Sequence, residues 1–160
     1  MTTLPPPEWA PDLDHELSQL VLLHHIMKQA DYRTAYAKPV RRAIDVAYAT
    51  HFRALTEFFH DGRPKGRPQA SDLTYAEVAG ESSPFLPYTT YAAQRLEDAD
   101  KLAGHLTKLR RTRTSDWGSD QDWLLIWPMI QRLLTRPGME QLLPGTLAAI
   151  VEVGLTMKGK

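Results

Sequence analysis

The clearest helical pattern in the chain lies between residues 40 and 60. When successive residues are rotated by about 100°, the apolar side chains of this segment gather on one broad face. They are Val40, Ile44, Ala47, Tyr48, Leu55, Phe58 and Phe59, and the opposite face carries Arg42, Arg53, Glu57 and His60. Pro39 suits the first turn of a helix and Gly62 suits its C-terminal cap. The pattern therefore predicts a long, core-facing helix.

Two segments on either side of this one have the same amphipathic spacing. The earlier segment, from Asp12 to about Ala30, is predicted to be a helix with Asp12 as its N-cap. The later segment begins near Thr90, carries Leu96, Ala99, Leu102, Leu106 and Leu109, and ends in a basic run of residues 108–113. Between them, residues 72–79 fit a short helix capped by Ser71 or Asp72.

The last third of the chain predicts further helices. Ser119 is placed to cap a helix that runs to about Leu134, and Pro128 is expected to kink or divide it. A short turn over residues 139–143 follows, and Pro144 can open a final helix that reaches about Leu155. Because no segment shows convincing strand alternation, we expect an all-α bundle of four to five long helices.

Length and composition restrict the architecture and the kinds of partner. A chain of 160 residues suits one domain, and we expect an extended arm over residues 1–11, a helical domain over 12–156 and a flexible tail over 157–160. The 19 basic and 19 acidic residues balance, so RNA would have to be bound by a local patch. The absence of cysteine excludes disulfides and fits the cytoplasm. No segment predicts a signal peptide or a membrane span.

Candidate chemistry is concentrated on the polar face of the helix over residues 40–60. Arg53 and His60 are seven positions apart, so they lie on one face roughly 10 Å from each other, with Glu57 between them. In one interpretation these residues form a solvated face with an ordinary Arg–Glu pair. In the other, Arg53 binds an anionic group and His60 transfers a proton. The second interpretation requires both groups to lie in a cleft or an interface.

The segment from Arg53 to His60, RALTEFFH, resembles the spaced Arg–His motif of the HEPN superfamily. The surrounding HFRALTEFF and the later AGHLT are also similar to helices of bacterial HEPN-like proteins, so the resemblance covers about residues 40–110. It implies an all-α, commonly dimeric protein and a metal-independent endoribonuclease of a defence or toxin–antitoxin type, with Arg53, His60 and Glu57 as catalytic residues. Active members often carry a polar residue after the arginine, where this chain has Ala54. The alternative is a non-catalytic helical protein that works by interaction or dimerisation.

Three histidines project toward the predicted core, namely His24, His51 and His105. They are predicted to be neutral core residues, and the alternative is a divalent metal site built from all three. We expect no cofactor and no metal. The sequence Glu57 to His60 also repeats the Glu-x-x-His of di-iron bundles, but those proteins need two copies and this chain has one.

Two basic segments follow the second and third predicted helices. If they lie at the same end of the bundle, they would form a patch that contacts RNA phosphates. The other interpretation is that they are ordinary solvated loops and charges that compensate the helix ends. The tentative RNA-binding residues are Arg63, Lys65, Arg67, Arg110, Arg111 and Arg113. The tryptophans at positions 117, 123 and 127 are predicted to be core or interface residues. The expected partners are RNA, a second copy in a homodimer, and an antitoxin or other regulatory protein.

Overall fold

The structure is a computed structural model that describes residues 7–59, 73–80, 90–104 and 117–155. Every regular element in these ranges is a helix, which confirms the predicted all-α fold. None of the described helices is long and apolar enough to cross a membrane. The long helices are α1 (Ala10–Lys28), α3 (Lys38–Phe59), α5 (Thr90–Gly104) and α7 (Asp120–Leu134), and the shorter ones are α2 (Tyr32–Ala35), α4 (Tyr75–Ala79), α8 (Met139–Leu142) and α9 (Pro144–Glu152).

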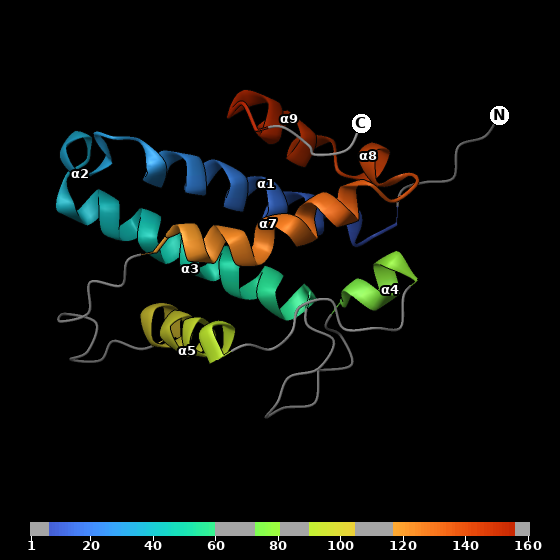
Figure 1. Cartoon of the computed structure of the whole chain (residues 1–160), viewed down its shortest axis with the longest axis horizontal. Coiled ribbons are helices and arrows are strands. Elements are labelled where there is room, and N and C mark those ends of the chain that lie inside the picture. The colour runs from blue at the N-terminus through green and yellow to red at the C-terminus, as the bar shows by residue number, and fades with distance from the viewer. Residues whose placement is uncertain (1–6, 60–72, 81–89, 105–116, 156–160) are drawn as a thin grey trace.

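Helices α1 and α3 lie side by side through the middle of the molecule (Figure 1). Helix α9 packs against α1, α5 packs against α3, and α7 contacts both α3 and α8. Apolar side chains from α1, α3 and α7 meet in one core because each helix turns its apolar stripe inward. The fully buried members include Leu17, Leu20, Val21, Tyr48, Phe52, Leu55, Ile126, Ile130 and Leu133.

Helix α1 begins at Ala10, so Asp12 is not its N-cap. Trp9 occupies the cap position without a side-chain hydrogen bond, and it packs against the core as a half-buried residue. Asp12 instead lies in the first turn, where a carboxylate is favourable against the helix dipole. The end of the expected arm is therefore helical, while residues 1–6 lie outside the described part of the chain.

Helix α3 matches its predicted span, with Pro39 in the first turn, but its apolar face is buried over only part of its length. The first buried residue is Tyr48, and Val40 is 46% exposed although the pattern placed it in the core. The early turns of α3 extend beyond the main core, where Asp45 accepts a hydrogen bond from Tyr32 at 3.3 Å. Periodicity identifies the inward face but cannot tell how far the neighbouring helices reach.

The later helices follow the prediction with one correction. Helix α4 starts at Tyr75 and is capped by Thr74, whose hydroxyl accepts from the Glu77 amide, and not by Ser71 or Asp72. Helix α7 is capped by Ser119 as predicted, and it continues through Pro128 as one helix, so the proline does not divide it. Pro128 is exposed, so its ring points away from the packed core.

Helix α9 receives its N-terminal cap from another helix. Its own cap residue, Leu143, has no polar side chain, and the carboxylate of Asp14 on α1 takes that position. Asp14 accepts from the Gly145 amide at 2.8 Å, the Thr146 amide at 2.7 Å and the Thr146 hydroxyl at 2.6 Å. A Cβ on Gly145 would lie 2.8 Å from Asp14 Oδ2, so glycine allows this close approach. The contact ties the last helix to the first.

Candidate functional site

Arg53 lies on α3 where that helix faces α5. Its Nε donates to Glu57 Oε1 at 3.3 Å, one turn later on the same helix, and its Nη1 forms an ion pair with Asp100 Oδ1 on α5. The Arg53 side chain is 38% exposed, compared with 24% for Glu57 and 53% for Asp100. The predicted Arg–Glu pair is therefore present, and a second carboxylate from a neighbouring helix joins it.

These contacts leave part of the guanidinium available. Glu57 uses Nε and Asp100 uses Nη1, and Nη2 makes no hydrogen bond within the described residues. The cluster of Arg53, Glu57 and Asp100, called the Arg53 cluster below, carries one positive and two negative charges. It can present a fixed donor to an anion, but its net charge opposes the approach of one.

His60, the partner expected for Arg53, lies outside the described part of the chain. The tentative RNA-binding residues lie outside it as well, namely Arg63, Lys65, Arg67, Arg110, Arg111 and Arg113. Helix α3 is described to Phe59, the residue before His60. The Arg–His site and the basic patch therefore stay predictions.

The two described histidines of the alternative metal site have other surroundings. His51 Nδ1 lies 2.7 Å from Glu16 Oε2 on α1, and its ring meets that of His15 edge-on at 5.7 Å between centroids. His24 is buried and stacks on Trp123 with ring centroids 4.0 Å apart. Among the described residues, no three His, Asp or Glu side chains gather in a way that could hold a metal ion, and His105 lies outside them.

Burial makes His24 a neutral core histidine. Desolvation, followed by the charge of Lys28, lowers its pKa from 6.5 to about 4. Its Nδ1 is buried and has no hydrogen-bond partner within the described residues, while the ring is stacked on Trp123. The prediction of a neutral core histidine agrees with this lowered pKa.

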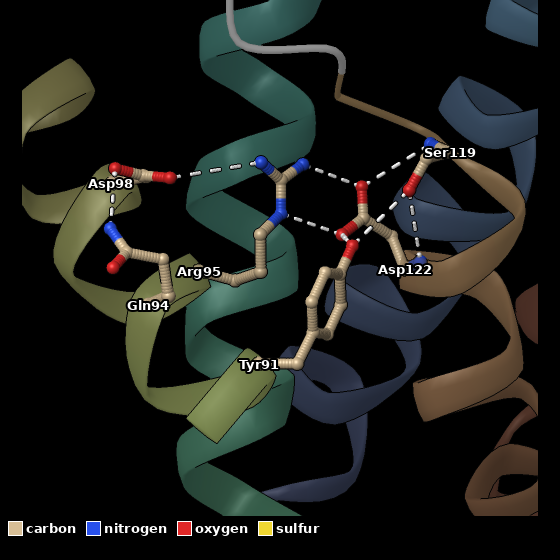
Figure 2. A network of polar contacts seen from close by, with 6 residues as sticks. All are labelled: Tyr91, Gln94, Arg95, Asp98, Ser119 and Asp122. Carbon is tan, nitrogen blue, oxygen red and sulfur yellow. Dashed lines mark hydrogen bonds and ion pairs between the residues drawn. The ribbon is translucent and has the colours of Figure 1, made fainter. Parts of the chain in front are cut away.

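Sequence reasoning missed a buried polar network between α5 and α7, which Figure 2 shows. Arg95 Nε donates to Asp122 Oδ1 at 2.7 Å and Arg95 Nη2 donates to Asp122 Oδ2 at 2.6 Å. The side chains are 9% and 0% exposed. This bidentate, buried ion pair places a charged residue on the inward row of α5, between the buried residues Ala92 and Ala99.

Neighbouring groups donate further hydrogen bonds to Asp122 and cover Arg95. Tyr91 donates its hydroxyl to Asp122 Oδ1 at 2.7 Å, and the Ser119 amide donates to Asp122 Oδ2 at 3.2 Å. The Arg95 guanidinium also lies over the ring of Trp117, 3.7 Å from its centroid. Burial disfavours the charged guanidinium, but the hydrogen bonds and charge of Asp122 outweigh this and raise the pKa of Arg95. We call these residues the Arg95 network.

Part of this network had a local signal in the sequence. Ser119 and Asp122 have the Ser-x-x-acidic spacing of a capping box, in which each side chain accepts from the other's backbone amide. The partnership with Arg95 had no such signal, because the two residues are 27 positions apart and belong to different helices.

Comparison of the chain with protein-family models, curated proteins and solved structures finds no match in any of the three.

Proposed function

We propose that this chain is a HEPN-like helical protein that cleaves RNA without a metal ion, as an endoribonuclease of a bacterial defence or toxin–antitoxin type. The observation that supports the proposal is the placement of Arg53. Carboxylates from two helices hold its guanidinium, the side chain is 38% exposed, and Nη2 has no partner within the described residues. A guanidinium fixed in this way offers directed donors to a phosphate oxygen.

The proposed reaction divides the work between two side chains. The ribose 2′-oxygen attacks the phosphorus, the bond to the 5′-oxygen breaks, and the products carry 2′,3′-cyclic phosphate and 5′-hydroxyl ends. Arg53 stabilises the charge that develops on the phosphate oxygens, and Glu57 helps to orient it. His60 transfers one of the two protons involved, either from the 2′-hydroxyl or to the leaving 5′-oxygen, and water takes up or supplies the other.

The test is cleavage of RNA by the purified protein in the presence of EDTA. Arg53→Ala and His60→Ala should each lower the cleavage rate by roughly 100-fold or more. His25→Ala is the matched control, because His25 is exposed on α1 and lies outside the Arg53 cluster. Cleavage that survives both substitutions, or that needs a divalent metal, would rule out this mechanism.

A second candidate function is assembly with another copy of the chain, without catalysis. The outward row of α7 consists of Gln121, Leu124, Pro128 and Arg132, all exposed, and Leu124 is 70% exposed. The row is apolar in its middle and polar at both ends. An antiparallel copy of α7 would place Leu124 opposite Pro128 and Gln121 opposite Arg132, which is the self-complementarity that a two-fold contact requires.

Light scattering of the purified protein at micromolar concentration tests this assembly. The wild type should have the mass of a dimer, and Leu124→Glu should have the mass of a monomer because a buried, unpaired charge opposes association. Val151→Glu is the matched control, since Val151 on α9 is 78% exposed and lies outside the α7 row. A monomeric wild type would contradict the second candidate.

A further inference from the structure

The donors of Arg53 are divided between its two carboxylates in a way that affects any bound phosphate. A guanidinium grips a two-oxygen anion along one of two edges, formed either by Nε with Nη2 or by Nη1 with Nη2. Arg95 uses the first edge to bind Asp122. In Arg53, Glu57 occupies one nitrogen of the first edge and Asp100 occupies one nitrogen of the second.

A phosphate can therefore reach Nη2 without competition, whereas Nε and Nη1 are each already in contact with a carboxylate. A bidentate contact, which is stronger and more directional than a single one, requires either Glu57 or Asp100 to give way. Asp100 is the easier carboxylate to displace, because it is 53% exposed whereas Glu57 is 24% exposed. Water can solvate the released Asp100 carboxylate at little cost. Asp100 also belongs to α5, so its release leaves the position of Glu57 on α3 unchanged.

We infer that Asp100 is an autoinhibitory residue: it occupies the Nη1 side of Arg53 in the free protein, and a phosphodiester displaces it on binding. This inference rests on the proposed function and gives it a competing group that the Arg–His motif does not contain. Displacement moves the negative charge of Asp100 away from the guanidinium. The Arg53 cluster carries a net charge of −1 while Asp100 is ionised, and neutralising Asp100 would bring that charge to zero.

Binding of RNA that cannot be cleaved tests the inference separately from catalysis. The probe is a fluorescein-labelled, single-stranded 2′-O-methyl RNA of mixed sequence, measured by fluorescence anisotropy. Asp100→Asn should lower the dissociation constant by roughly four- to fifteen-fold, as expected when one carboxylate about 5 Å from a phosphate is neutralised in a partly solvated site. This gain in RNA affinity should become smaller as the salt concentration rises, because salt screens the charges.

Two further proteins serve as controls. Glu97→Gln changes the formal charge equally, but Glu97 forms its ion pair with Lys101 on the same helix, so its effect should be less than about twofold. Arg53→Ala combined with Asp100→Asn should lose the gain, since no guanidinium remains to be released.

Each outcome decides the inference. A gain seen in Asp100→Asn, absent from Glu97→Gln and dependent on Arg53 would support it. An equal gain in both single variants, a gain that survives without Arg53, or a dissociation constant for Asp100→Asn no lower than that of the wild type would overturn it. If the gain appears but the wild type cleaves no RNA, the Arg53 cluster binds phosphate and the proposed ribonuclease activity fails.

Discussion

Arg53 and Arg95 are both bound by carboxylates of a neighbouring helix, but their surroundings differ. Arg95 grips both oxygens of Asp122 and is 9% exposed, while Arg53 contacts two separate carboxylates through single nitrogens and is 38% exposed. The Arg95 pair is also covered by Trp117 and joined by Tyr91. Residue type alone therefore does not distinguish an arginine that fixes the fold from one that is available to a ligand.

The difference follows from the cost of rearranging each pair. Separating Arg95 from Asp122 would leave two charges in a poorly solvated region, so the contact is suited to holding α5 and α7 together. Separating Arg53 from Asp100 exposes both groups to water and costs little. An arginine that binds a ligand has to exchange a contact within the protein for a contact with the ligand. The pair of Arg53 with Asp100 permits this exchange, and the pair of Arg95 with Asp122 does not.

The largest effect is expected when the Arg95 network is broken. Asp122→Ala should lower the free energy of unfolding by about 3–5 kcal/mol, because it leaves the buried Arg95 with only its longer contact to Asp98, at 3.9 Å, and removes the partner of Ser119. Urea denaturation followed by circular dichroism measures the change.

Two further variants sharpen this prediction. Asp120→Ala is the control, since this carboxylate is exposed and pairs only with Lys28 among the described residues; it should leave the midpoint nearly unchanged. Arg95→Met combined with Asp122→Leu should recover much of the loss, because neither member of the bidentate pair is left as a buried charge. If Asp122→Ala costs no more than Asp120→Ala, the buried network does not stabilise the fold.

The second prediction concerns pH and His24. Its pKa is about 4 in the folded protein and about 6.5 when solvated, so the unfolded chain binds more protons between these values. The stabilisation associated with the lowered pKa of His24 is fully present above about pH 6.5 and is lost as the pH falls toward 4. Between pH 7 and pH 5 this linkage should remove about 2 kcal/mol of unfolding free energy.

Substitution isolates the contribution of His24 from that of other acid-titrating groups. His24→Leu should show a shallower loss of stability between pH 7 and pH 5 than the wild type, measured by urea denaturation at each pH. His25→Leu removes an exposed histidine from the next position and should keep the wild-type slope. Equal slopes for all three proteins would show that His24 is not the group responsible.

A third, smaller effect is expected at the contact between α1 and α9. Asp14→Ala should lower the free energy of unfolding by about 1–2 kcal/mol, since the first amides of α9 lose the carboxylate that caps them. Asp12→Ala, on the exposed side of the same helix turn, is the control. Thermal unfolding should separate the two variants, and similar midpoints would argue against capping by Asp14.

The structure shows which features were readable from the sequence. Ser119 and Pro144 mark helix starts through short-range chemistry, and both predictions are confirmed. The apolar stripe of α3 was also readable, because helical periodicity depends on neighbouring residues. Two contacts were not predicted, namely the pair of Arg95 with Asp122 and the cap that Asp14 provides for α9, because each joins helices that are distant in the sequence. The prediction that Val40 lies in the core is wrong for a related reason. The periodicity of one helix does not show how far the neighbouring helices extend, and therefore where the core ends.

The smallest stability effect, and the sharpest contrast, is expected for Arg53→Ala. It removes two partly solvated ion pairs, which together contribute less than about 1 kcal/mol after solvent screening. Arg95→Ala should cost about 3–5 kcal/mol, because Asp122 would remain buried without its counter-charge. Urea denaturation of the two variants measures this difference, and RNA cleavage by folded Arg53→Ala measures function separately. If Arg53→Ala unfolds as readily as Arg95→Ala, Arg53 also fixes the fold, and its loss of cleavage would no longer identify it as a phosphate-binding residue.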